Sequence, residues 1–204
     1  MMRRSTALGE ENLPALLAIS RVIDAVTGFI GYHVRWLILA AVVVSAVNAV
    51  IRKTFDISSN AWLELQWFLF GAVFMLAAAY TLQKNAHVRI DVVSSRISKT
   101  ARDWIDLACH LVMLAPLTLI MIWLSWPFFW ESYSGNEGSP NAGGLTVWPS
   151  KFFVLAGFVL LFFQMLSEAI KRIAVLAGVI AEPEPQALHG HNPADLEPKG
   201  GHNE

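Results

Sequence analysis

The sequence is poor in charged residues and has a single cysteine. Asp, Glu, Lys and Arg make up 15% of its 204 residues, whereas about 25% is usual in a soluble protein. This shortage argues against the polar shell that a water-soluble domain needs. With Cys109 alone, one chain forms no intramolecular disulfide and no metal site built from several thiolates. The 15 Lys and Arg against 16 Asp and Glu leave no basic excess for a nucleic-acid surface.

Long apolar segments dominate what remains, since 55% of the residues are hydrophobic. Four segments contain no Asp, Glu, Lys or Arg: residues 36–51, 65–83, 107–130 and 152–167. About 20 helical residues cross a hydrocarbon core roughly 30 Å thick, and lipid offers no partner for an unpaired peptide group. We therefore predict an all-α membrane protein with four transmembrane helices, at about residues 33–51, 62–83, 105–130 and 150–170.

Lys and Arg are distributed unequally between the two ends of the predicted spans. Arg52, Lys53 and Lys151 fall on one side, and the other twelve of the 15 fall on the opposite side. Because Lys and Arg near span ends tend to stay in the cytoplasm, we predict that both termini are cytoplasmic, with the loop between the second and third spans. The N-terminal residues lack a continuous apolar core, so no cleaved signal peptide is expected.

The segments outside the predicted spans have patterns of their own. In residues 1–31, apolar residues recur at helical spacing opposite a polar stripe of Ser20, Asp24, Thr27 and Gly31. The loop between the second and third spans repeats this pattern over residues 90–104. We expect two amphipathic helices along the cytoplasmic membrane surface, flanking a transmembrane domain of residues 32–180. Residues 181–204 are rich in Pro and charge, and we expect them to be disordered.

Motifs for catalysis are missing from the sequence. There is no GxSxG, P-loop or HExxH pattern, and no ionisable residue lies in the middle of a predicted span. A pump or channel with its own pathway needs such residues, which are unfavourable in lipid and persist mainly where they are used. We therefore predict no enzyme activity, no cofactor and no bound metal.

Several residues near the outer ends of the spans allow two interpretations. Glu64 either pairs with the nearby cations Arg52 and Lys53 or contacts a partner protein. Trp123 and Trp126 belong to a stripe at helical spacing. That stripe either anchors the third span among lipid headgroups or forms a docking face for another helix.

Histidines near the inner ends of the spans raise a different class of function. His33, His87 and His110 fall near the cytoplasmic ends of the first three spans, and transmembrane b-type cytochromes bind haem between imidazoles on facing helices. A cytochrome-like membrane anchor subunit is therefore the alternative interpretation, and an absorption spectrum of the purified protein distinguishes it. A self-sufficient four-helix channel is a third class, which the lack of charge within the spans disfavours.

One string of residues is more specific than composition. Residues 60–91 read NAWLELQWFLFGAVFMLAAAYTLQKNAHVRID, a span opened by Glu64 and closed by HVRxD. Further on, the chain carries ExS at 137–139, GGL at 143–145, WPxK at 148–151 and Gln164. Together these motifs resemble the small, DctQ-type membrane subunit of tripartite ATP-independent periplasmic (TRAP) transporters. The resemblance is to the branch labelled mannitol or chloroaromatic, which includes keto-acid systems.

This resemblance implies a supporting role in transport. In that family a periplasmic protein captures the substrate, often a carboxylate, and delivers it to a large elevator-type membrane subunit that imports it with sodium. The small subunit enlarges the static scaffold of the large one and carries neither substrate nor ion. For this chain the resemblance implies a bacterial inner-membrane protein whose partners are the large subunit, the periplasmic binding protein and lipid, with no nucleic acid.

The resemblance also implies where the partners bind. The outer loop, residues 131–150, is rich in Gly and Pro and is expected to lack secondary structure. Its candidate residues for docking the periplasmic protein are Glu137, Ser139, Gly143, Gly144, Trp148 and Lys151. The candidates for contact with the large subunit, or for anchoring, are Glu64, Gln66, His87, Arg89, Asp91, Trp123, Trp126 and Gln164. For Arg89 and Asp91 the alternative role is local helix capping.

Overall fold

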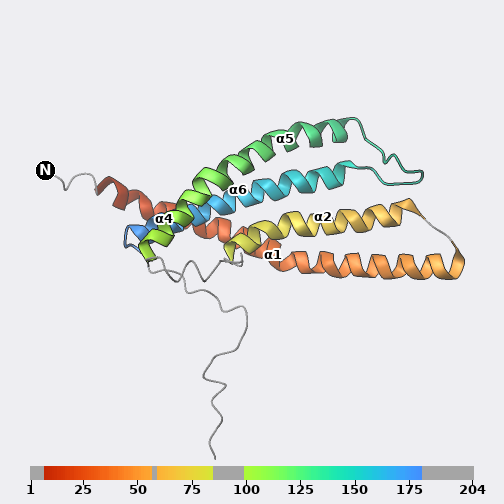
Figure 1. Ribbon diagram of the computed structural model, residues 1–204, viewed down its shortest axis with the longest axis horizontal. Helices are drawn as coiled ribbons and strands as arrows, with labels where there is room; N and C mark the ends of the chain where they lie inside the picture. The colour runs from red at the N-terminus through yellow and green to blue at the C-terminus, as the bar shows by residue number, and fades with distance from the viewer. Residues whose placement is uncertain (1–6, 57–58, 85–98, 181–204) are drawn as a thin grey trace, which may run out of the picture.

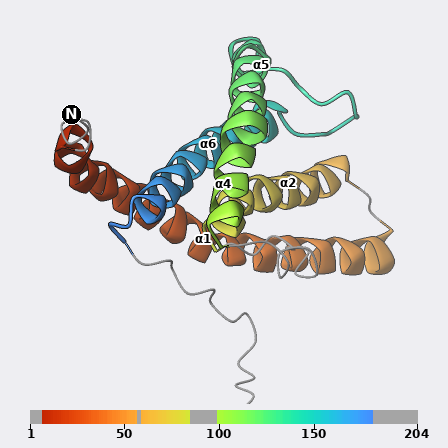
Figure 2. The same ribbon diagram turned by 60° about the vertical axis from the view of Figure 1, so that its left-hand side comes forward.

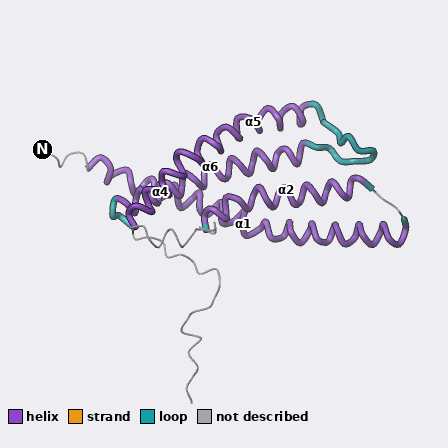
Figure 3. The backbone as a smooth tube through the Cα atoms, in the orientation of Figure 1, coloured by secondary structure: helices purple, strands orange, loops and turns teal. Residues whose placement is uncertain are grey.

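The protein is built from helices in the computed structural model, which describes residues 7–56, 59–84 and 99–180 (Figure 1). The helices are α1 (Ala7–Phe55), α2 (Asn60–Gln83), α4 (Lys99–Cys109), the π-helix η1 (His110–Leu114), α5 (Ala115–Ser134) and α6 (Trp148–Leu176). Figure 3 shows helices and loops and no strand in the described ranges. The extended pairing there is limited to one isolated bridge, between Gly138 and Thr146. The predicted all-α class is confirmed.

Within the described residues, four stretches are long and apolar enough to cross a membrane, which confirms the predicted number of spans. They comprise Pro14–Phe55, Asn60–Gln83, Trp104–Ser134 and Trp148–Leu176. Each is longer than the segment predicted from apolar residues alone. The reason is that a helix continues through polar residues at its ends as long as its backbone hydrogen bonds persist. The placement of the termini in the cytoplasm stays a prediction.

The long helices pack in the order α1, α2, α6, α5, with α5 at the edge against α6 (Figures 1 and 2). Close approach depends on glycines. A Cβ at Gly31 would lie 2.2 Å from the Cγ atom of Tyr80, and one at Gly157 would lie 2.7 Å from the Cβ atom of Met75. Small residues permit this kind of contact between membrane helices. A groove of about 230 Å³, lined in part by Trp67 and Phe128, separates α2 from α5.

The amphipathic segment before the first span is part of α1, a single helix of 49 residues. Its polar stripe does not face water. Ser20 and Thr27 are 1% and 0% exposed, whereas Val22 and Phe29 on the apolar side are 64% and 66% exposed. An amphipathic pattern shows that the two faces of a helix differ, but not whether each face contacts water, lipid or protein. Here the polar face packs on α6, because α6 supplies polar groups that pair with it.

The third span follows directly from α4 through η1 into α5. Pro116 lacks the N–H that a regular helix needs at that position, and the π-helix precedes it, with the Ala115 N–H donating to the His110 carbonyl. Thr118 Oγ1 donates to the Leu114 carbonyl at 2.8 Å. The helix predicted over residues 90–104 is seen only from Lys99 onward, since residues 85–98 lie outside the described residues.

Candidate functional site

The outer loop between α5 and α6 is closed by its own hydrogen bonds. Ser139 N–H donates to the Leu145 carbonyl at 3.0 Å, and Val147 N–H donates to the Glu137 carbonyl at 2.9 Å. At its tip Gly143 has a φ of +72°, which glycine adopts without steric strain. Residues 135–147 contain no helix or strand element, but residues 131–134 belong to α5 and residues 148–150 to α6, so the predicted loop was too long at both ends. The part that remains is a tight hairpin rather than an open chain.

Glu64, on the second turn of α2, is the main anchor of this loop. Its carboxylate accepts hydrogen bonds from the Leu145 N–H at 2.6 Å, from Asn141 Nδ2 at 2.9 Å and from the Ser139 hydroxyl. Asn60, one turn earlier, donates to the Ala142 carbonyl at 3.0 Å. The partners of Glu64 are therefore loop donors rather than the cations at positions 52 and 53, which corrects that interpretation.

Gly144 makes this anchorage possible. A Cβ at Gly144 would lie 2.6 Å from Oε1 of Glu64 and 2.5 Å from the Cβ atom of Ser139. Real Cβ atoms do not approach other atoms so closely, because packed interiors resist overlap. The GGL motif thus combines a glycine needed for its backbone conformation with a glycine needed for space.

A second link joins the loop to the start of α6. Lys151 Nζ contacts Glu137 Oε2 at 2.5 Å and lies 4.1 Å from the ring centroid of Phe128 on α5. The hydrogen bond from Lys151 holds the pKa of the Glu137 carboxyl below its usual value. Trp148 packs edge-on against Tyr133, with ring centroids 5.5 Å apart. The six loop residues singled out by sequence therefore belong to one ordered unit near the α1–α2 connection (Figure 1).

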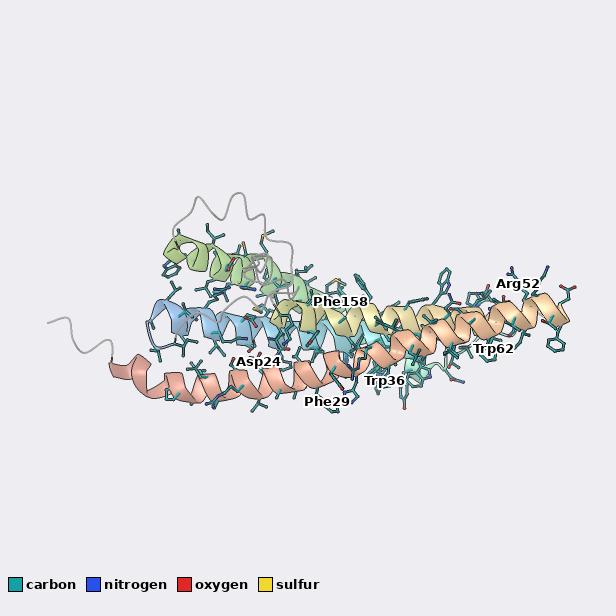
Figure 4. The ribbon with its side chains drawn as sticks, turned by 90° about the horizontal axis from the view of Figure 1, so that it is seen from below. Asp24, Phe29, Trp36, Arg52, Trp62 and Phe158 are labelled. Atoms are coloured by element: carbon teal, nitrogen blue, oxygen red, sulfur yellow. The ribbon has the colours of Figure 1, made fainter. Side chains whose placement is uncertain are left out.

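A polar cluster lies toward the opposite end of the molecule, where α1 meets α6. Figure 4 shows Asp24 on the side of α1 that faces α6. Its carboxylate accepts hydrogen bonds from Ser167 Oγ at 2.8 Å and Gln164 Nε2 at 2.9 Å, and it pairs with Lys171 at 3.0 Å. Lys171 also pairs with Glu168 at 2.6 Å. One lysine thus serves two carboxylates.

The same cluster extends to α2 and α4. Gln83 Nε2 donates to the Asp24 carbonyl at 2.7 Å, and Arg172 pairs with Asp106 of α4 at 3.2 Å. Because the side chains of Glu168 and Arg172 are only 7% and 8% exposed, their pairing is needed to offset the loss of hydration. These contacts tie four helices together at one level.

Sequence reasoning singled out Gln164 of this cluster and missed the rest. From the sequence, Asp24 belongs to a polar stripe at the membrane surface, Glu168 lies near the end of the fourth predicted span, and Lys171 is one of the cations on the cytoplasmic side. The available signal was the i, i+3 spacing of Glu168 and Lys171 together with the serine at position 167. Opposite charges and a hydroxyl on one helix face indicate a polar partner on a neighbouring helix.

Of the remaining predicted positions, the three that the structure describes are not brought together. Gln66 is half-buried on α2, and Trp123 and Trp126 are 79% and 57% exposed on α5. His87, Arg89 and Asp91 lie outside the described residues.

Nothing in the described ranges favours a haem site. His33 is exposed, and its Nδ1 lies 2.8 Å from the Phe29 carbonyl. The part of the chain that the structure describes holds no group of three metal-binding side chains.

The chain matches the model of a known protein family. Residues 40–175, more than half of the chain, match the model of the family described as tripartite ATP-independent periplasmic transporters, DctQ component. The matched range includes the outer loop and every α6 residue of the polar cluster, but not Asp24. No curated protein matches the chain, and neither does any solved structure.

Proposed function

Because the chain belongs to the DctQ component family of TRAP transporters, we propose that it packs on the large membrane subunit of its transporter. In this role it is non-catalytic: it enlarges the static scaffold against which the mobile part of the large, elevator-type subunit moves. We extend the proposal to sodium-coupled import of organic acids across the bacterial inner membrane, with both termini of this chain in the cytoplasm.

The distribution of polar groups supports a scaffold role. Glu64 is satisfied by the outer loop, and Asp24, Glu168 and Lys171 are satisfied by one another. Between these two levels the described helices expose large apolar side chains, among them Trp67 at 75% and Phe74 at 73%. These described helices offer apolar surface for packing and have ordered ends, but between the two levels they do not line a solute pathway with ionisable side chains.

The outer loop supports a second part of the proposal, the docking of the periplasmic binding protein. Anchored by Glu64, the hairpin holds its exposed residues in one conformation, including Glu137 and Asn141. A surface that is already ordered loses little conformational entropy on binding. The loop therefore suits repeated, transient contact with a soluble partner.

Reconstitution tests the proposal directly. The chain is purified with and without the large subunit and placed in liposomes, and sodium-driven uptake of organic acids is measured with the binding protein added. We expect uptake only when both membrane subunits are present, and stable co-purification of the two. Transport by this chain alone, or full uptake in its absence, would contradict the scaffold role.

A further inference from the structure

Helix α5 has two faces of opposite character. Toward α6 it presents a stripe of small polar residues, Thr118, Ser125 and Ser132, which are 0%, 4% and 1% exposed. Their spacing of seven residues keeps them on one side of the helix. The opposite face forms a shallow groove whose lining is Leu119, Ile122, Trp123, Trp126 and Pro127. Trp123, at 79%, is among the most exposed large apolar residues that the structure describes.

On this side of α5 a proline deprives one backbone carbonyl of its regular helical donor. Pro127 lies inside α5, and proline has no N–H to donate to the carbonyl four residues earlier, which belongs to Trp123. Pro116 differs, because a π-helix precedes it and Thr118 donates to the neighbouring Leu114 carbonyl. No side chain among the described residues donates to the Trp123 carbonyl.

This carbonyl lies inside the apolar layer. Phe129 of α5 contacts Phe152 of α6, with ring centroids 5.6 Å apart, and Phe152 directly follows Lys151, the outermost charged residue of α6. Trp123 precedes Phe129 by six residues, which places it about 9 Å further from the headgroups. Lipid tails carry no hydrogen-bond donor, so a carbonyl at this depth needs a donor from protein.

We propose that this groove seats a transmembrane helix of the large membrane subunit and that a side chain of that helix donates a hydrogen bond to the Trp123 carbonyl. The inference rests on the proposed function, since it specifies the surface used for the scaffold contact. The partner helix carries a donor such as Ser, Thr, Asn or Trp at the level of Pro127. The exposed Trp123 and Trp126 then flank that helix instead of serving only as headgroup anchors.

Pro127→Ala tests the donor requirement. The substitution supplies the missing N–H within α5, so the external donor loses its acceptor, while the lone subunit gains a helical hydrogen bond. We expect binding of the solubilised variant to immobilised large subunit to weaken about three- to tenfold. The melting temperature of the isolated variant should rise. Pro14→Ala, near the start of α1, is the matched control and should leave binding unchanged.

A steric variant tests the groove independently of the hydrogen bond. Leu119→Trp fills it, whereas Val43→Trp adds the same bulk on α1, where Val43 is 51% exposed. Binding should fall for Leu119→Trp alone.

The inference is overturned if Pro127→Ala raises the melting temperature and leaves binding unchanged, the result expected of a groove that faces only lipid. Unchanged binding of Leu119→Trp overturns it too. So does a cross-linking group placed at position 126 that links this chain to a second copy of itself, because the groove would then be a contact between two copies of this chain. If the unaltered chain fails to bind the large subunit at all, the proposed function itself fails.

Discussion

Both ends of the helix bundle are held by carboxylates, but the two ends use them differently. At the end predicted to be the outer one, Glu64 accepts hydrogen bonds from neutral donors of the hairpin, two side chains and one N–H. At the inner end Asp24 and Glu168 share one cation, Lys171, and Asp24 also accepts hydrogen bonds from a hydroxyl and an amide group of α6. The outer carboxylate orders a surface loop, whereas the inner pair joins membrane helices.

This difference predicts how far a substitution at each end destabilises the protein. Water can reach the outer loop, so donors released there are rehydrated and the damage stays local. The side chain of Glu168 is 7% exposed, so a charge left alone at the inner end has little water to compensate it. Loss of the inner cation should therefore weaken the whole fold, and loss of the outer carboxylate should loosen one loop. Four substitutions or titrations, ordered by expected effect, test this contrast.

Lys171→Met should have the largest effect. It leaves the carboxylates of Asp24 and Glu168 without their shared cation, and loss of one partner from a buried pair costs about 3 to 5 kcal/mol. Because Lys171 is 19% exposed, we expect about 3 kcal/mol, the lower end. Unfolding of the purified protein in detergent measures this. Lys53→Met, on the exposed end of α1, is the control. Equal stability of the two variants would show that the pairing of Lys171 with Asp24 and Glu168 does not stabilise the fold.

Gly144→Ala should have the next largest effect. The new methyl group overlaps Oε1 of Glu64 and the side chain of Ser139, and overpacking costs about 1 to 3 kcal/mol. We expect about 1 to 2 kcal/mol, since a surface loop can shift. Gly138→Ala is the matched control, because nothing lies within 4 Å of its Cβ position. If both variants melt together at the temperature of the original protein, Gly144 is not under steric constraint.

Glu64→Gln should act on the loop and leave the bundle intact. An amide keeps the shape of the side chain but turns one acceptor into a donor, which then faces the donors of the loop. We expect limited proteolysis within residues 135–147 to speed up several-fold with little change in melting temperature. Affinity for the periplasmic partner should also fall. Glu131→Gln, exposed at the end of α5, serves as control; a global loss of stability would remove the contrast between the ends.

Acidification should have the smallest effect. The pKa of Glu137 is lowered in the folded protein by Lys151, so the stability that this pair adds is present at neutral pH. It is lost as pH falls from the usual glutamate value, about 4.3, through the folded pKa. The melting temperatures of the original protein and of Glu137→Gln should therefore converge at low pH. A difference that stays constant from neutral pH downward would show that the pair adds nothing.

Much of the fold and part of the site follow from the sequence. The charge-free segments predict four helices, because lipid offers no hydrogen-bond partner to a peptide group and a helix pairs these groups within one segment. The residues of the outer loop also follow, through the motifs around Glu137, Gly144 and Lys151. The partner of Glu64 does not follow, since residues 64 and 145 are far apart in the chain and several donors and cations were equally available to that carboxylate.

The sequence by itself determined the membrane character, the number of spans and the helical class, because these depend on composition and on periodicity along one segment. Tertiary structure alone decided that the stripe of Ser20, Asp24 and Thr27 turns inward, and that Asp24 meets Lys171. Periodicity separates two faces of a helix without stating what covers either of them. Only the packing of α1 on α6 brings together the charges that stabilise the inner end, since pairing across helices is a property of distance in space.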